Sequence, residues 1–277
     1  MDPRNLNMNI NVGQQMTNMN MNSVPDEAMN LLAQSTGCFV KQRMELLEIL
    51  TGCETKNRYD VALKINNTFY MAFHCKEVSN CCCRNFCPSE LREFQMDIKY
   101  FPNGVDRGSW ALIDRPFKCS CYCLCRPEMT IKLRSGEYIG KVAEPWGCCQ
   151  VCIDIANSQN QVKYQIDRTY CESAFLCRNN WCGAMSGVDF PILYNDGGIT
   201  GNGKLQDGNI ERKGRSLLET FVDSDADCFD VNFPKTASPQ EKLLIIATVL
   251  MLDFRYFEDN GDDDKKRGGG VRMGMNF

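Results

Sequence analysis

Histidine is almost missing from this 277-residue chain, because His74 is the only one. A metal site that needs several imidazoles therefore cannot form, and a Ser-His-Asp triad would depend on this single residue. We expect His74 to be an ordinary strand residue. A surplus of positive charge is also missing, since the formal net charge is −4. The sequence thus carries no strong signal for nucleic-acid binding.

A membrane-length apolar run is missing as well. The uncharged segment Leu243–Leu252 would rise about 15 Å as a helix, against roughly 30 Å of hydrocarbon in a bilayer. Extending it to Phe257 adds Asp253 and Arg255, which would point about 200° apart on a helix. The sequence therefore predicts a helix buried in protein rather than a helix inserted in the bilayer.

The first residues show no basic segment followed by an apolar run, so we expect no signal peptide. The 18 cysteines are then expected to be reduced, intracellular thiols instead of disulfides. Clusters such as Cys81-Cys82-Cys83 favour metal binding or acylation over cross-links.

The clearest local signal lies near the end of the printed sequence. Ser238 is placed to cap a helix, Pro239 suits its first position, and Glu241 completes a capping box. Asn260-Gly261 is typical of a helix stop. These residues predict a helix over 239–258 that is apolar on all sides and needs an apolar enclosure.

Short alternating runs separated by turn residues precede this helix and are typical of strands. The predicted strands are Phe39–Leu50, Tyr59–Ile65, Thr68–Phe73, Phe94–Tyr100, Trp110–Asp114, Met129–Leu133, Tyr138–Ala143, Gln150–Ile155, Gln161–Ile166, Val188–Leu193, Leu217–Val222 and Phe229–Phe233. A closed sheet of this size can hold a helix. We therefore predict a mainly β fold, a closed antiparallel barrel of about twelve strands around a hydrophobic C-terminal helix.

The barrel domain is expected to span 35–259. Residues 1–34 are rich in Asn, Met and Gln, which predicts a disordered tail. Residues 260–277 combine an acidic run, a basic run and glycines, and are expected to form a second disordered tail. The Gly-rich stretch 195–208 is expected to be a loop.

Five segments resemble the phospholipid scramblase family. They are MELLEILTGCETKNRY (44–59), DRPFKCSCYCLC (114–125), GKVAEPWGCC (140–149), FVDSDADCFDVNFP (221–234) and LDFRYFE (252–258). The resemblance implies a tubby-like barrel around a C-terminal helix. It also implies Ca²⁺-triggered, ATP-independent, bidirectional movement of phospholipids between leaflets, without covalent chemistry and thus without enzyme activity. Acylated cysteines would hold the chain at the cytoplasmic face of a membrane, expected to be the plasma membrane. Residues 1–34 lack PxxP, so partners that bind Pro-rich segments are not implied.

Four cysteines alternate along one segment, so in an extended chain their sulfurs share one side. They are Cys119, Cys121, Cys123 and Cys125. The resemblance implies covalent palmitate on them, and stable membrane attachment needs more than one acyl chain. Zinc is the alternative, with Cys149-Gln-Val-Cys152 and Cys81-Cys82-Cys83…Cys87 as further ligands. The isolated Cys53, Cys171 and Cys228 fit small buried hydrophobic residues.

Four carboxylates gather before the helix, and such oxygen ligands suit Ca²⁺. They are Asp223, Asp225, Asp227 and Asp230, of which the first three would share one side of an extended segment. The spacing does not match an EF-hand. The resemblance implies an acidic residue where Thr236 stands, so we expect weak Ca²⁺ binding that Thr236→Asp would tighten. A solvated acidic turn is the alternative.

The three tryptophans, Trp110, Trp146 and Trp181, fit either a membrane interface or core and rim packing. The basic run Arg212-Lys213-Gly-Arg215 fits an acidic-lipid patch, a nuclear-import signal or a solvated turn. Three functional hypotheses follow: a membrane-tethered scramblase, a lipid-anchored adaptor that binds phosphoinositides or proteins without transport, and a zinc-binding regulatory module. No pattern in the chain indicates an oligomeric state.

Overall fold

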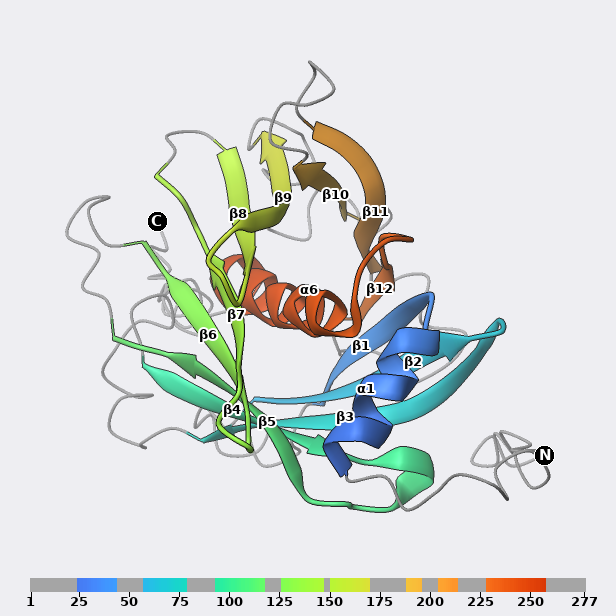
Figure 1. Cartoon of the computed structure of the whole chain (residues 1–277). Coiled ribbons are helices and arrows are strands. Elements are labelled where there is room, and N and C mark those ends of the chain that lie inside the picture. Colours follow the sequence, from blue (N-terminus) through green and yellow to red (C-terminus); the bar gives the residue numbers. More distant parts are fainter. Residues whose placement is uncertain are drawn as a thin grey trace, which may run out of the picture.

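Twelve strands make a single closed barrel in the computed structural model (Figure 1). The structure describes residues 24–43, 57–78, 93–117, 126–146, 150–169, 188–195, 204–213 and 228–257. The strands are β1 (Gly37–Arg43), β2 (Arg58–Ile65), β3 (Thr68–Val78), β4 (Phe94–Tyr100), β5 (Ser109–Arg115), β6 (Glu128–Leu133), β7 (Tyr138–Ala143), β8 (Gln150–Asn157), β9 (Val162–Thr169), β10 (Val188–Asn195), β11 (Lys204–Lys213) and β12 (Cys228–Asn232). The predicted barrel is confirmed.

Each strand pairs antiparallel with its neighbour in sequence, and β1 closes the barrel against β12. Strand direction therefore alternates around the wall, so all odd-numbered strands finish at one end, here called the odd end. The even-numbered strands finish at the opposite end, the even end. This topology decides which segments, far apart in sequence, share one end of the molecule.

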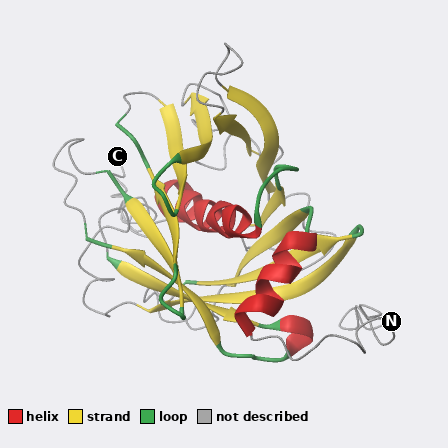
Figure 2. Ribbon diagram, viewed as in Figure 1, coloured by secondary structure: helices red, strands yellow, loops and turns green. Residues whose placement is uncertain are grey.

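The helix α6 (Pro239–Leu252) lies inside this wall (Figure 2). Ser238 caps it as predicted, because its side chain accepts a hydrogen bond from Glu241 N at 3.3 Å while the Glu241 carboxylate accepts from Ser238 N at 2.8 Å. Every residue of Lys242–Leu252 is buried, and the one hydroxyl, on Thr248, donates to Leu244 O at 2.9 Å. One π-helical turn, η3 (Asp253–Phe257), follows. Among the described residues, no helix combines the length and the apolarity needed to cross a bilayer.

A short helix, α1 (Val24–Gln34), overturns part of the predicted N-terminal tail. Its Ala28 and Leu32 are fully buried in the core. The Lys242 ammonium of α6 donates to the carbonyls of Leu32, Ala33 and Ser35 at 2.9, 3.0 and 2.8 Å. These carbonyls lie at and just beyond the C-terminal end of α1, where a cation interacts favourably with the helix dipole. The tail expectation was wrong for 24–34, and residues 1–23 lie outside the described part of the chain.

The predicted loop at 195–208 is also wrong in part, because β11 begins at Lys204. Gly208 explains why a polar, Gly-containing segment forms a strand here. A Cβ on this residue would lie 2.5 Å from Asn232 O and 3.1 Å from Pro234 Cδ, so only glycine lets β11 approach β12 this closely. The strand predicted at 217–222 lies outside the described residues.

Candidate functional site at the odd end

The end of the central helix is tied to the odd end of the barrel by contacts with strand termini. Tyr59, at the start of β2, donates to the buried Asp253 carboxylate at 2.5 Å. Phe254 stacks on Phe94, at the start of β4, with ring centroids 4.3 Å apart. Phe257 meets Phe190 of β10 at 6.1 Å. The helix therefore enters at the even end and its last turn closes the odd end.

Arginine side chains surround this last turn, here called the arginine layer. Its members are Arg115, Arg126, Arg168, Arg212 and Arg255. Alternation along the strands places the first, third and fourth on the same face as the buried Ile113, Ile166 and Ile210.

Aromatic rings lie beside four members of the arginine layer, one of which is Arg255, with its guanidinium carbon 5.6 Å from the Tyr256 ring. The guanidinium carbon of Arg115 lies 5.4 Å from the Phe94 ring, that of Arg168 lies 5.9 Å from Phe190, and that of Arg212 lies 4.2 Å from Phe257. Cation–π contacts of this kind orient a guanidinium group without neutralising it.

Glu144 links two members of the arginine layer. Its Oε1 accepts from Arg126 Nη1 at 2.8 Å and its Oε2 accepts from Arg255 Nε at 3.2 Å. Only 3% of the Glu144 side chain is exposed, against 20% for Arg126 and 21% for Arg255. Since a buried carboxylate is stable only when paired, both arginines are needed to hold it.

The proposed acylation cluster, Cys119, Cys121, Cys123 and Cys125, lies outside the described residues. The segment that contains the cluster joins β5, which finishes at the odd end, to β6, which begins there. Phe117, the last described residue before the cluster, is 52% exposed. Acylation of the cluster thus stays a prediction. Of the two flanking strands, β5 ends and β6 begins at the odd end.

Among the proposed Ca²⁺ ligands, Asp223, Asp225 and Asp227 lie outside the described residues, and Asp230 lies on β12. The Asp230 carboxylate is 3.8 Å from Lys213 Nζ and 30% exposed. Within the described part of the chain, no group of three or more His, Cys, Asp or Glu side chains could hold a metal ion.

Thr236 does not belong to this acidic segment. Its hydroxyl lies 3.3 Å from Asp207 Oδ2, beyond the even end of β12, whereas Asp223, Asp225 and Asp227 precede that strand. Five strand residues span about 17 Å, so β12 separates residue 236 from the point where the segment with these three aspartates joins the strand. Since three of the four proposed ligands lie outside the described residues, the expected effect of Thr236→Asp stays a prediction, and the separation along β12 favours an unchanged affinity instead.

Cys38 and Cys75, both buried in the described wall, are protected thiols. Burial, with smaller contributions from Asp230 and Cys75, raises the pKa of Cys38 well above its usual range. Burial, followed by Asp60 and Asp97, likewise raises the pKa of Cys75. Protonated thiols are poor nucleophiles and poor metal ligands. Cys228 is 2% exposed, as predicted for a small buried hydrophobic residue, and Cys53 and Cys171 lie outside the described residues.

His74 is an ordinary residue of β3, as predicted. Its Nδ1 contacts the Asp60 carboxylate, and its ring lies 4.0 Å from that of Phe101.

Of the tryptophans, Trp110 is a core residue with 1% exposure, whereas Trp146, just after β7, is 73% exposed. Trp181 lies outside the described residues, as does Arg215 of the basic run.

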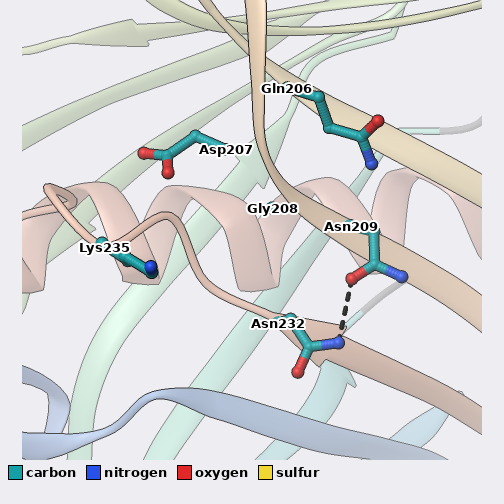
Figure 3. Close-up of a pocket in the computed structure, with 6 residues that line it drawn as sticks. All are labelled: Gln206, Asp207, Gly208, Asn209, Asn232 and Lys235. Carbon is teal, nitrogen blue, oxygen red and sulfur yellow. Dashed lines mark hydrogen bonds between the residues drawn. The ribbon is translucent and has the colours of Figure 1, made fainter.

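A shallow polar pocket of about 470 Å³ lies at the opposite, even end (Figure 3). It is lined by Gln206, Asp207, Gly208, Asn209, Asn232 and Lys235. Asn232 Nδ2 donates to Asn209 Oδ1 at 2.9 Å across it. One carboxylate and one ammonium leave the lining without a net charge, and the pocket lies at the other end of the barrel from the arginine layer.

Comparison with known families decides what this arrangement represents. The Scramblase family model matches residues 15–259, which include every described strand, α1, α6 and η3. The chain belongs to the Scramblase family. The recognition made from five short segments is thereby confirmed, and so is the extent of the match over the barrel and the central helix.

Individual relatives carry the same family name. The chain is 31% identical over 234 residues to the human protein "Phospholipid scramblase 4", with 83% of this chain covered. It is 30% identical to the mouse "Phospholipid scramblase 4" and 29% identical over 246 residues to the human "Phospholipid scramblase 1". The match spans 64% of the length of the two scramblase 4 proteins and 69% of human scramblase 1.

Proposed function

We propose that this protein moves phospholipids between the two leaflets of a membrane to which it is attached. The observation that carries the proposal is the Scramblase family match over 15–259, because this range contains the complete barrel and its central helix. The movement is ATP-independent, bidirectional and triggered by Ca²⁺. Attachment is through palmitate on Cys119, Cys121, Cys123 and Cys125, at the cytoplasmic face of the plasma membrane.

The arginine layer supports a role with phospholipids. Guanidinium groups bind phosphate oxygens through paired hydrogen bonds, and every phospholipid headgroup carries a phosphate. Arg212 and Arg168 belong to strand ends at the odd end, the same end at which the segment carrying the proposed acyl chains joins the wall. Lipid headgroups near the anchor would therefore be close to Arg168 and Arg212, whose side chains are partly exposed.

Calcium is proposed to act on the same end. Asp223, Asp225 and Asp227 directly precede β12, whose first residue, Cys228, pairs with Lys213 in the sheet. Bringing these carboxylates together around Ca²⁺ removes their mutual repulsion and stiffens the start of β12. The ring centroid of Phe229 on this strand lies 6.0 Å from that of Phe257. A stiffer start of β12 would therefore also restrain the last turn of the helix.

Reconstitution into vesicles tests the proposal. The full-length protein would be placed in vesicles that carry a fluorescent phospholipid in one leaflet, without ATP and with or without Ca²⁺. We expect the reporter to become accessible from the other leaflet on addition of Ca²⁺. Arg212→Gln is expected to slow this movement, and Lys132→Gln, an exposed lysine on β6, serves as the matched control. Protein that binds the vesicles without any reporter movement would overturn the proposal.

One observation favours a second candidate, the lipid-anchored adaptor. Residues Lys242–Leu252 are packed on every side by the barrel, so α6 presents no face to lipid in this state. A barrel of this kind can bind phosphoinositides or proteins at a membrane surface without moving lipid. The same vesicles distinguish the two functions, because the adaptor would bind phosphoinositide-containing vesicles while the reporter lipid stays in its leaflet.

A further inference from the structure

The pair Asn103-Gly104 forms the tip of the connection between β4 and β5, at the even end of the barrel (Figure 1). Asn103 has φ 53° and ψ 32°, and Gly104 has φ 84°, so both residues lie in the left-handed region. Val105 N donates to Pro102 O at 3.0 Å and closes the turn. A positive φ at both central residues is typical of a type I′ turn, for which Asn followed by Gly is a preferred pair.

The tip of this turn is exposed, while its base is held separately. Residues 103–107 are all exposed, and a Cβ built on Gly104 would find no heavy atom within 4 Å. At the base, Tyr100 N donates to Gly108 O at 3.0 Å and Arg107 N donates to Tyr100 O at 2.9 Å. The tip can therefore rearrange while the hydrogen bonds at the base stay intact.

We propose that Asn103 is a site of spontaneous covalent modification, at which its side-chain amide is converted to aspartate and isoaspartate. The backbone nitrogen of Gly104, after losing its proton to water, attacks the side-chain carbonyl carbon Cγ of Asn103. The bond from Cγ to Nδ2 breaks, and Nδ2 takes up a proton and leaves as ammonia. The product is a cyclic succinimide that contains Cγ and the Gly104 nitrogen. This step needs no enzyme, metal or oxidant.

Water then opens the succinimide at either of its carbonyl carbons. Opening at Cγ leaves an aspartate in the original chain. Opening at the main-chain carbonyl carbon leaves the chain running through Cγ, which is isoaspartate. In both products a carboxylate replaces the amide, so the side chain gains a negative charge at neutral pH. The inference goes beyond the proposed function, because the reaction involves neither a membrane nor a phospholipid.

The glycine distinguishes Asn103 from the other described asparagines with a positive φ. Asn66, Asn67 and Asn160 are likewise exposed, with φ values of 49°, 61° and 59°. They are followed by Asn, Thr and Gln, whose side chains hinder the approach of the backbone nitrogen, whereas glycine has no Cβ. Two further Asn-Gly pairs of the sequence, at 202–203 and 260–261, lie outside the described residues. Conformation and exposure are thus matched within one molecule, and the following residue differs.

The modification is expected to change the turn and its charge. Isoaspartate lengthens the backbone by one carbon between Pro102 and Val105, so the hydrogen bond that closes the turn should be lost. The new carboxylate also joins Asp106, which lies in the same connection and pairs with Lys99 at 2.9 Å. We therefore expect faster amide exchange over residues 101–108 of the modified chain, with exchange in the core of the barrel strands unchanged.

Peptide mapping of the aged full-length chain tests the proposal. The protein would be kept for several weeks at physiological temperature in mildly alkaline buffer and compared with a fresh sample after trypsin digestion. Trypsin cuts after Lys99 and Arg107, which places residue 103 in one peptide, and after Lys64 and Lys76, which places Asn66 and Asn67 in another. We expect a gain of about 1 Da in the first peptide and at least about tenfold less of this product in the second. Electron-based fragmentation would identify isoaspartate in the first.

A matched variant, Asp207→Asn, places another Asn-Gly pair in the wall of the barrel. A Cβ on Gly208 would lie 2.5 Å from Asn232 O, so this glycine is packed against β12 and we expect little modification before it. Equal modification at 103 and at 66–67 would overturn the role of the glycine. Modification at 207 as fast as at 103 would overturn the role of the exposed turn. The proposal also fails if residue 103 stays unmodified in the folded chain while the isolated tryptic peptide is modified, because the turn would then protect it.

Discussion

Glu144 and Arg255 join the wall of the barrel to the end of the central helix, through a hydrogen bond of 3.2 Å between Oε2 and Nε. The two residues are 111 positions apart in the sequence. Glu144 follows β7 and Arg255 belongs to η3, so this contact holds the last helical turn against the odd end of the barrel.

Removing this carboxylate is expected to loosen the helix end. Glu144→Gln leaves two partly buried arginines without their shared counter-charge, a kind of change that typically costs roughly 3–5 kcal/mol for a buried pair. Because Arg126 and Arg255 retain some exposure, we expect the lower part of this range. Chemical denaturation would measure the free energy of unfolding, with Glu137→Gln, an exposed carboxylate, as the control. Equal stability of both variants would contradict the linking role.

The central helix is expected to contribute most of the barrel's packing energy. Ile245 and Leu252 lie on nearly the same face, two turns apart, and both are fully buried. Replacing either with Ala should destabilise the fold by roughly 2–5 kcal/mol. Gln240→Ala, at an exposed position in the first turn, should change the stability by less than about 0.5 kcal/mol. A cooperatively folded chain without residues 238–277 would argue against this role.

Lys242 is expected to hold α1 in place. Lys242→Met removes the donor for three carbonyls and should weaken docking of α1 by roughly 1–3 kcal/mol. Amide hydrogen exchange over residues 24–34 would report this local loss, while exchange in the barrel strands stays unchanged. Lys41→Met on β1 is the control. If α1 exchanges at the same rate in both variants, the contacts to Lys242 do not stabilise it.

Membrane attachment is expected to depend on the alternating cysteines. Replacing Cys119, Cys121, Cys123 and Cys125 with Ser removes several acyl chains at once, and one remaining chain would bind a bilayer only marginally. The variant should move from the membrane pellet to the cytosolic fraction of cells. Cys53→Ser/Cys171→Ser, two isolated cysteines, controls for loss of thiols as such. A quadruple variant that stays in a carbonate-washed pellet would place the anchor elsewhere.

Calcium binding is expected to be weak and to depend on Asp225 and Asp227. Isothermal calorimetry on the full chain should give an affinity in roughly the millimolar range, lost in Asp225→Asn/Asp227→Asn. Thr236→Asp should leave the affinity unchanged, because β12 separates residue 236 from the acidic segment. A tighter affinity in Thr236→Asp would show that the two positions approach one another in the Ca²⁺-bound state.

Sequence patterns predicted those elements whose stability is largely local. The capping box at Ser238 and Glu241 and the all-round apolar run after it were sufficient to place α6. Strands with strict alternation, such as β2 with Tyr59, Val61 and Leu63 buried, were equally clear. The closed barrel then followed from the number of strands and the need to enclose one helix.

Elements that depend on distant contacts were missed. The helix α1 has Pro25 and two acidic residues in its first turn, signals that could have predicted it, but its composition suggested disorder without the contact to Lys242. The strand β11 was missed because Gly208 was interpreted as a loop residue. In the structure this glycine lets β11 approach β12 closely.

The enclosure of α6 also has a consequence for how the protein is made. Tyr59 and Asp253 touch although 194 residues separate them, and α6 follows all twelve strands in the chain. During synthesis the strands leave the ribosome before the helix that fills them, so their apolar faces stay open until translation has passed residue 257. Such long-range closure is slow and exposes unpaired strand edges. We therefore expect the barrel to complete its folding only after residue 257 has left the ribosome, with its apolar faces open to chaperones until then.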